Sequence, residues 1–448
     1  MAHFSLPLAI ALTLLPAPAT TTAAAVDPPG TVTVGTAKYG IALMPGAVFT
    51  TDAAHELEPP RPSQLIRQSL SGTGDTIVVG PPQLIGSTHT NLVVASAYRV
   101  MVSSELRYGT GAPKFAGGFP EALSGTRLVV HKFPSMIYPY NFRYDVRTST
   151  QEPDVQPPPP WRFGAVDAFG NYLVYSRQLA STTQVRRRDQ ATGVDLLVAT
   201  IGRSGVRSVA VNGNLVAWVT DCPDRDRPCS QTVGYRIVGG TGALGPVRTF
   251  ATRGTKDLDL SATHLALDTI TAKREIRLVT LGSNAIRVIG ALPPNPSEGS
   301  TGGIPVEYPP QIPVHFDLDG DRIGWLGAVQ NAHVTAVATP PIRARYLGNG
   351  IIPGSFNPNV SRFGASLPFS KSLTQCAVVF RQGTRVFRTL ACIVRNGDAL
   401  ISWDGRDSAG RIVPKGRYDW TLTGSDSAGS ALWYTGTGAR IGSSVTVV

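Results

Sequence analysis

The acidic segment "HFDLDGDRIGW" has the residue types and spacing that most resemble a cation-binding loop. Asp317, Asp319 and Asp321 alternate within it, and carboxylate oxygens are ligands that Ca²⁺ prefers. The further ligands and the late Glu of an EF-hand loop are missing. Comparable places elsewhere in the chain read "VNGN", "DAFGN" and "LSATH". We therefore assign these acids to turns between strands, and we predict neither a metal site nor a bound cofactor.

The chain shows no recognisable catalytic grouping. Neither "GRSGV" nor "GTGAR" has the form of a G-x-S-x-G nucleophile turn, and the seven His residues show no HExxH spacing. Carboxylate pairs for glycoside chemistry stay open, because distant repeats can bring them together, and Glu307, Asp317 and Asp221 are candidates. Three or more acids converging on the axis of such a fold would favour an enzyme. We assign no catalytic residue from the sequence.

Four cysteines form two local pairs. Cys222 and Cys229 bracket "PDRDRP", while Cys376 and Cys392 lie near the C-terminus. An even number of closely spaced cysteines favours disulfides in an exported protein, and neither pair has the nearby His expected of a zinc site. We predict the disulfides Cys222–Cys229 and Cys376–Cys392.

The first 25 residues resemble a secretory signal peptide. An apolar stretch from Leu6 to Leu15 is followed by small residues that end at Ala25. The apolar stretch is short for a membrane span, and no other segment reaches about 18 apolar residues. We therefore expect a secreted protein, in the extracellular space or associated with the cell wall, with no membrane span after cleavage.

The remaining chain predicts an all-β protein. The chain contains 47 Gly and 36 Pro residues, and only 16% of its residues are charged. A turn followed by a short apolar strand recurs at intervals of about 40–60 residues. The copies are "SGTRLVVHK", "FGNYLVYSR", "NGNLVAWVT", "SATHLALDT" and "DGDRIGWLG", around Leu128, Leu173, Leu215, Leu265 and Ile323, with an earlier copy, "TGDTIVVGP", around Ile77.

Repeats of this length, each with several strands, are typical of β-propeller blades. One blade is a small sheet that cannot bury its apolar faces alone, whereas blades stacked around an axis bury them against one another. Residues 26–350 resemble the repeat regions of TolB-like and WD40-like propellers, and this length accommodates six or seven blades.

Residues 351–448 predict a second, smaller domain. "DSAG" occurs twice, at Asp407–Gly410 and at Asp426–Gly429, with the Asp and Gly positions that tight turns favour. In "RYDWTLT", Tyr418 and Trp420 alternate with polar residues, as in a half-buried strand. With Trp403, these aromatics would form the core of a small β-sandwich that unfolds independently of the propeller.

The same segment resembles the FlgD/Vpr Ig-like family. The resemblance rests on "SFNPN", "VFRQGTRVFRTL", "ISWDGRDSAGRIVPKGRYDWTLTGSDSAG" and the final "SSVTVV". It implies an Ig-like fold and a role as a spacer or attachment module. The family's acidic, glycine-rich continuation after Asn-Pro-Asn is absent, so the resemblance implies no cation site here.

The basic balance of the chain, with a net charge of +11, suggests an anionic partner. No nucleic-acid fold signature accompanies it, so we predict no nucleic-acid binding. The densest basic run is "VRRRD", where Arg186 and Arg188 would share one face of a strand, either as a solvated face or as part of an anion-binding surface.

The sequence therefore favours an exported, monomeric, non-enzymatic binding or scaffold protein. Its propeller would present a ligand surface to an anionic cell-wall polymer, an acidic polysaccharide or another exported protein. One alternative is a propeller-type polysaccharide hydrolase or lyase. Another is an accessory partner of exported proteases, which only the Ig-like resemblance suggests. The fold alone does not choose among these functions.

Overall fold

The computed structural model describes residues 31–34, the strands between residues 38 and 151, and most of residues 162–448. In the last range it leaves out residues 203, 224–227, 240–241, 272, 294–315, 328–330, 338–341, 349–351, 396–397 and 439. The expected signal peptide and the proline-rich segment before Trp161 lie outside the described residues. Every regular element that the structure describes is a β-strand.

Seven four-stranded antiparallel sheets follow one another along the chain and form the blades of a β-propeller. Blade 1 contains β2 (Lys38–Met44), β3 (Ala47–Asp52), β4 (Leu65–Ser69) and β5 (Asp75–Val79). Blade 2 contains β6 (Val94–Ser96), β7 (Arg99–Val102), β8 (Glu105–Tyr108) and β9 (Lys114–Phe115). Blade 3 contains β10 (Phe119–Ser124), β11 (Arg127–Lys132), β12 (Tyr140–Asp145) and β13 (Thr150–Gln151).

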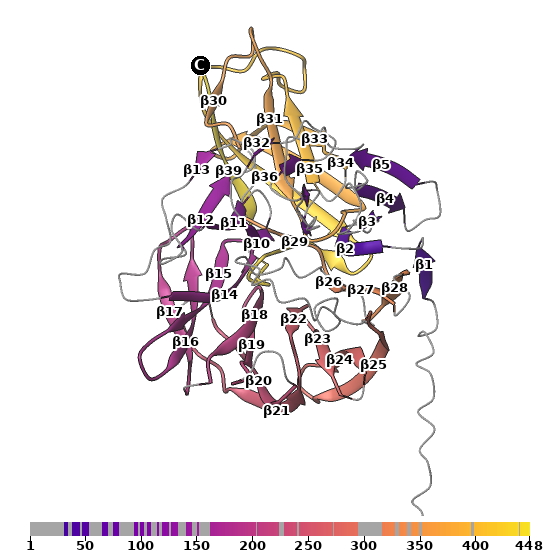
Figure 1. The fold of residues 1–448 in the computed structure, drawn as a ribbon. Coiled ribbons are helices and arrows are strands. Elements are labelled where there is room, and N and C mark those ends of the chain that lie inside the picture. The colour runs from indigo at the N-terminus through magenta and orange to yellow at the C-terminus, as the bar shows by residue number, and fades with distance from the viewer. Residues whose placement is uncertain are drawn as a thin grey trace, which may run out of the picture.

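The later blades are longer and more regular. Blade 4 contains β14 (Arg162–Phe169), β15 (Tyr172–Gln178), β16 (Thr183–Asp189) and β17 (Asp195–Ile201). Blade 5 contains β18 (Val206–Asn212), β19 (Leu215–Thr220), β20 (Ser230–Ile237) and β21 (Arg248–Arg253). Blade 6 contains β22 (Asp257–Leu260), β23 (His264–Ile270), β24 (Arg274–Thr280) and β25 (Ala285–Ala291). Figure 1 shows the blades succeeding one another around a ring.

Blade 7 closes the ring with a strand from the other end of the propeller sequence. It contains β26 (Phe316–Asp319), β27 (Arg322–Leu326) and β28 (Ala332–Ala336), and its outer strand is β1 (Val32–Val34). Thr33 lies opposite His333 in this antiparallel pairing, and Thr33 Oγ1 is 3.3 Å from His333 Nδ1. The pairing leaves β28 without an open edge, which protects the ring from edge-to-edge association.

The apolar residues of the blades are buried between neighbouring sheets, as the repeat pattern predicts. Val174 and Val185 of blade 4 pack in one cluster with Val209, Val216 and Trp218 of blade 5. A second cluster joins blade 5 to blade 6, and a third joins blade 6 to blade 7. Among the described residues, the apolar clusters of the ring therefore join neighbouring sheets.

The two faces of the propeller differ in the connections that they carry. The first and second strands of a blade are joined by tight turns, such as Gly170–Asn171 and Gly213–Asn214, in which the Gly residues have φ near +60°. We call this side the short-turn face. The opposite side receives the connections between the second and third strands, such as residues 179–182, and the connections between blades, such as residues 254–256. The longest stretches of sequence between consecutive blades, residues 80–93, 152–161 and 294–315, lie outside the described residues. We call it the long-loop face.

Residues after the propeller form a two-sheet β-sandwich, which lies at the top of the view in Figure 1. One sheet contains β30 (Ser355–Phe356), β39 (Ile441–Val447), β36 (Gly416–Asp426), β32 (Gln375–Gln382), β33 (Arg385–Ala391) and β37 (Gly429–Ser430). The other contains β31 (Phe363–Pro368), β35 (Asp398–Trp403) and β34 (Ile393–Arg395).

The aromatic residues singled out in the sequence form the sandwich core. Trp403, Tyr418 and Trp420 are almost fully buried, and the Trp403 ring stacks on Phe380 with centroids 4.2 Å apart. Trp403 Nε1 donates to the carbonyl of Arg406 at 3.0 Å, and Tyr418 Oη donates to the carbonyl of Pro414 at 2.7 Å. The turn-rich segment between Trp403 and Tyr418 is therefore hydrogen-bonded at two places to side chains of the sandwich core.

A short segment before the sandwich strands also packs with the sandwich. Strand β29 (Arg345–Tyr346) pairs in parallel with β38 (Leu432–Trp433), and Ala344 and Tyr346 belong to the sandwich core. Residues 344–346, which the sequence analysis places in the propeller domain, therefore contact the sandwich. In the part of the chain that the structure describes, no helix is long and apolar enough to cross a membrane.

Candidate functional site

Four aspartates gather on the innermost strands of the propeller, around the ring axis. Asp167 lies on β14, Asp257 and Asp259 lie on β22, and Asp317 lies on β26. Asp167, Asp259 and Asp317 occupy equivalent positions in their blades. Each lies two or three residues before the first residue of the turn that follows its strand. We call these four residues the axial acids.

Three of the axial acids bind the backbone of the next blade. Asp167 Oδ2 accepts a hydrogen bond from Val211 N at 2.7 Å, and Asp259 Oδ2 accepts one from Leu318 N at 2.7 Å. Asp317 Oδ2 accepts one from Leu43 N at 2.5 Å, which joins the last blade to the first. These contacts repeat one geometry around the ring, so the acids act as cross-links between blades.

Asp257 instead contacts the preceding blade, and it does so through a side chain. Ser208 Oγ on the inner strand of blade 5 donates to Asp257 Oδ1 at 2.7 Å, and Leu258 N donates to the same oxygen at 2.8 Å. Each axial acid therefore has at least one oxygen engaged by a protein donor.

Burial of the axial acids, together with the negative charge of neighbouring acids, raises their pKa values and favours their neutral forms. Burial, and then the charge of Asp259, raise the pKa of Asp167 from 3.8 to about 8, against the lowering effect of the hydrogen bond from Val211. Burial raises the pKa of Asp257 to about 6. Burial also raises the pKa of Asp259, which shares a hydrogen bond with Asp317, and two carboxyl groups need one proton between them for such a bond.

The exposure of the axial acids agrees with a position facing the axis. Asp257 is exposed and Asp167, Asp259 and Asp317 are partly exposed, although protein surrounds all four. Side chains that face the axis of a ring can contact water and still be enclosed by charge and backbone on every side.

The acids proposed from the sequence do not come together as one site. Asp317 is an axial acid, whereas Asp221 lies at the long-loop face, where its Oδ1 accepts from Cys222 N at 3.0 Å. Glu307, His315 and the side chain of Asp319 lie outside the described part of the structure. Among the described residues, no group of three His, Cys, Asp or Glu side chains has a metal-binding arrangement.

The basic run on β16 is divided between two environments. Arg186 Nε is 3.2 Å from Asp195 Oδ1, and Tyr175 Oη donates to the same carboxylate at 2.6 Å. Arg187 is almost fully buried, with its guanidinium 4.0 Å from the centre of the Tyr172 ring, and Nη2 donates to Gly239 O at 2.9 Å. Arg188 is partly buried. The alternation expected for this strand is present, and the Arg187 side is used for packing against blade 5.

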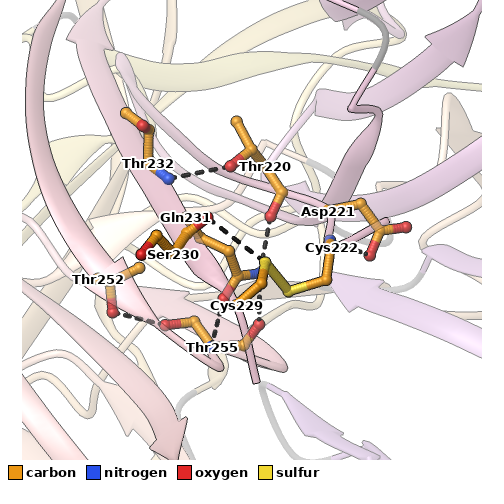
Figure 2. Close-up of a disulfide and its surroundings, with 9 residues drawn as sticks. All are labelled: Thr220, Asp221, Cys222, Cys229, Ser230, Gln231, Thr232, Thr252 and Thr255. Atoms are coloured by element: carbon orange, nitrogen blue, oxygen red, sulfur yellow. Dashed lines mark hydrogen bonds between the residues drawn. A yellow bond between two sulfur atoms is a disulfide. The ribbon is translucent and has the colours of Figure 1, made fainter. Parts of the chain in front are cut away.

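Both predicted disulfides are present. Cys222–Cys229 closes a connection on the long-loop face, and Cys376–Cys392 joins β32 to the residue after β33. Figure 2 shows how Gln231 secures the base of the first loop. Gln231 Nε2 donates to Thr220 O at 2.7 Å and to Thr255 O at 3.0 Å, and its Oε1 accepts from Thr255 N at 2.6 Å. The loop therefore extends from a hydrogen-bonded base between blades 5 and 6.

The sandwich is docked on the short-turn face at blades 4 and 5. Tyr434 is buried in the apolar cluster that these two blades share. A Cβ on Gly170 would lie 2.5 Å from Tyr434 Cγ, and one on Gly213 would lie 2.4 Å from Tyr434 O, so both turns need glycine for this contact. Arg345 Nη1 donates to Asn212 Oδ1 at 2.9 Å across the same boundary. No pattern in the sequence marked Tyr434 as a contact residue.

The fold is a seven-bladed β-propeller with a docked β-sandwich. Comparisons with known proteins found solved structures with similar folds. No family model matches the chain, and no curated protein matches it. PorZ, a surface component of the type-IX secretion system of Porphyromonas gingivalis, is 12% identical over 95% of this chain and 60% of that chain, with a TM-score of 0.40. BamB from Moraxella catarrhalis is 12% identical over 64% of this chain and 79% of that chain, with a TM-score of 0.35.

A propeller domain from a different setting is about as similar. The Cps50 (Swd1) propeller of Myceliophteria thermophila is 9% identical over 68% of this chain and 99% of that chain, with a TM-score of 0.42. This chain therefore spans about three fifths of PorZ and nearly all of the Cps50 propeller domain. The assignment as a propeller rests on the seven sheets themselves.

Proposed function

We propose that this protein is an exported, non-enzymatic binding scaffold that presents the long-loop face of its propeller to a macromolecular partner. The docking of Tyr434 on the opposite face is the observation that carries this proposal. Because the sandwich contacts the short-turn face at blades 4 and 5, we assign ligand binding to the opposite face. Binding surfaces are commonly built from loops on a rigid scaffold.

Several features support export and a supporting role for the sandwich. Two disulfides and a leader-like first 25 residues suit an oxidising compartment. We propose that the sandwich is an FlgD/Vpr-like Ig module and that it serves for attachment. We further propose that the protein works as a monomer. Binding of an anionic polymer through Arg186 and Arg188 stays a prediction, and the polymer would compete with Asp195 for Arg186.

The alternative function is a polysaccharide hydrolase or lyase. Its specific support is that the four carboxyl groups of the axial acids converge. Their hydrogen bonds favour the structural role. Asp167, Asp259 and Asp317 each hold the backbone of a neighbouring blade, so none of the three is a carboxylate left free for substrate. Asp257 is held by Ser208 in the same way.

Assays of the wild-type protein and of Asp259→Asn/Asp317→Asn on acidic and neutral polysaccharides separate the two functions. Release of reducing ends detects hydrolysis, and absorbance of unsaturated uronates detects elimination. The binding role predicts no turnover by either protein. Turnover by the wild type that disappears in the variant, at a temperature where circular dichroism shows both to be folded, would establish the enzyme instead.

A further inference from the structure

The positive charge of the protein is concentrated in the sandwich. Residues 352–448 contain eleven Lys and Arg residues against five Asp and no Glu, which accounts for more than half of the net charge of +11. The sandwich is also the module that the docked Tyr434 fixes to the propeller. Its charge is therefore presented at a defined place relative to the ring.

Three connections meet at the end of the sandwich away from Tyr434. They are the 383–384 turn between β32 and β33, the 404–415 connection between β35 and β36, and residues 357–362 before β31. Ser408 N donates to Phe387 O at 3.0 Å, which ties the second connection to the first. A Cβ on Gly405 would lie 2.5 Å from Pro358 Cβ, which shows how closely the second and third approach. We call this end the distal tip.

All of the charged residues that are classed as exposed at the distal tip are basic. The exposed basic residues are Arg362, Arg385, Arg406, Arg411, Lys415 and Arg417. The acids of the same region, Asp404, Asp407 and Asp419, are only partly exposed. Among the described residues, Arg411 with Asp407 is the single ion pair that any of these six cations forms. The other five cations of the tip therefore form no ion pair with a described carboxylate.

Large apolar side chains are exposed between these cations. Val360 is 82% exposed, Val386 is 55% exposed and Ile412 is 45% exposed, one on each connection or beside it. Apolar side chains in such positions lose contact with water only when another phase or molecule covers them. Their mixture with cations is the combination that an anionic lipid surface accommodates, since headgroups neutralise the charge and the acyl boundary takes the apolar groups.

We propose that the distal tip attaches the protein peripherally to an anionic lipid bilayer. Arg362, Lys415 and Arg417 lie at the headgroups, and Val360 and Ile412 enter the interface. A purely acidic polymer would use the cations and leave the apolar side chains exposed, so the lipid surface accounts for both observations. The inference deepens the proposed attachment role of the sandwich and leaves the long-loop face of the propeller free.

Co-sedimentation of the full chain with vesicles tests this proposal. Vesicles of phosphatidylcholine with phosphatidylglycerol are compared with vesicles of phosphatidylcholine alone, at low and high salt. The charge variant is Arg362→Ser/Lys415→Ser/Arg417→Ser, and the apolar variant is Val360→Ser/Ile412→Ser. Matched controls on the propeller are Arg253→Ser/Lys273→Ser/Arg287→Ser and Ile237→Ser/Val288→Ser, all at exposed positions.

The wild type is expected to sediment with anionic vesicles only, and less at high salt. The charge variant should weaken binding on the order of a hundredfold, at about fivefold for each basic residue near an anionic surface. The apolar variant should weaken binding by about tenfold, because the buried methyl groups are lost. Both controls should bind like the wild type.

Three results would overturn the proposal. These are equal sedimentation with neutral vesicles, no sedimentation with anionic vesicles, and a loss in the controls as large as in the tip variants. Retention on polygalacturonate that the charge variant loses and the apolar variant keeps, without vesicle binding, would assign the tip to an acidic polymer. Partner binding at the long-loop face is measured without vesicles. A failure of the proposed function can therefore be distinguished from a failure of the proposed lipid binding by the distal tip.

Discussion

Tyr434 of the sandwich packs edge-on against Tyr172 of propeller blade 4, with ring centroids 5.0 Å apart. The Arg187 guanidinium lies on the Tyr172 ring and also reaches the backbone of blade 5. One aromatic pair therefore connects the sandwich to two blades at once. This contact argues against the independent unfolding that the sequence suggested for the sandwich, because burial of Tyr434 depends on both modules.

Replacing Tyr434 tests this connection. We expect Tyr434→Ala to lower the free energy of unfolding by about 3 kcal/mol, since it removes a large buried side chain and leaves Gly170 without its packing partner. Calorimetry should show the sandwich and propeller transitions moving apart. Val360→Ala, at an exposed position, is the control. An unchanged thermogram for Tyr434→Ala would show that the two modules are not coupled through this residue.

Replacing Trp403 tests the sandwich core. Trp403→Ala removes a fully buried ring that stacks on Phe380, and we expect a loss of about 3–5 kcal/mol, which is much of the stability of a domain this small. Because Tyr434 anchors the sandwich to blades 4 and 5, the propeller transition should also move to lower temperature. A propeller transition that stays in place would mean that the docked sandwich adds no stability to the ring.

The axial acids predict a pH dependence of stability. The pKa of Asp167 is raised to about 8 in the folded state, so the folded state holds a proton that the unfolded chain releases near pH 4. Asp167 thus stabilises the fold most at low pH, and this contribution falls as the pH rises from about 4 to about 8. Asp257 and Asp259, whose pKa values are also raised, act in the same direction.

Asp167→Asn should remove part of this dependence, because an amide keeps an oxygen that can accept from Val211 N and cannot ionise. The variant is expected to melt at a higher temperature than the wild type at pH 8 and at a similar temperature at pH 5. Asp419→Asn, on the outer surface of the sandwich, serves as the control. A variant that is less stable than the wild type at pH 8 would show that Asp167 is needed in its charged form.

The disulfides predict measurable losses of stability that follow the length of the closed loop. The sequence separation is 16 for Cys376–Cys392 and 7 for Cys222–Cys229. Paired Cys→Ser replacements should cost about 3 kcal/mol at the first and somewhat less at the second, since a longer loop gains more freedom in the unfolded chain. Urea unfolding of both variants measures these differences. Free thiols in the secreted wild type, or crossed pairing between the modules, would contradict the assignment.

The regular blades were predictable because each carries its own turn and apolar strand. Leu128, Leu173, Leu215 and Leu265 all lie in the second strands of their blades. The earlier copy around Ile77 is wrong in register, because Ile77 lies in β5, the fourth strand of blade 1. The second strand there is β3, which Pro45 and Gly46 precede in the sequence.

The closure of the ring and the contacts of the axial acids could not be predicted from the sequence, for a common reason. Strand β1 has three residues, and its partner β28 lies some 300 residues away, so no local pattern marks the pairing that sets the number of blades at seven. Asp167, Asp259 and Asp317 share one repeat position, and that signal was visible. We assigned Asp317 to a turn, however, whereas it lies in β26, and its contact with Leu43 exists only once the ring has closed.

Site-specific photo-crosslinking tests the central claim, that the long-loop face is the ligand face, most directly. A benzophenone amino acid is placed at Ser181 or Lys273, which are exposed on the long-loop face, and at Thr192 or Ser283, which are exposed on the short-turn face. Each protein is irradiated with the exported fraction of its native host. We expect adducts at Ser181 and Lys273 and none at Thr192 and Ser283. Adducts confined to Thr192 and Ser283, or no adduct at any position, would contradict the proposed function.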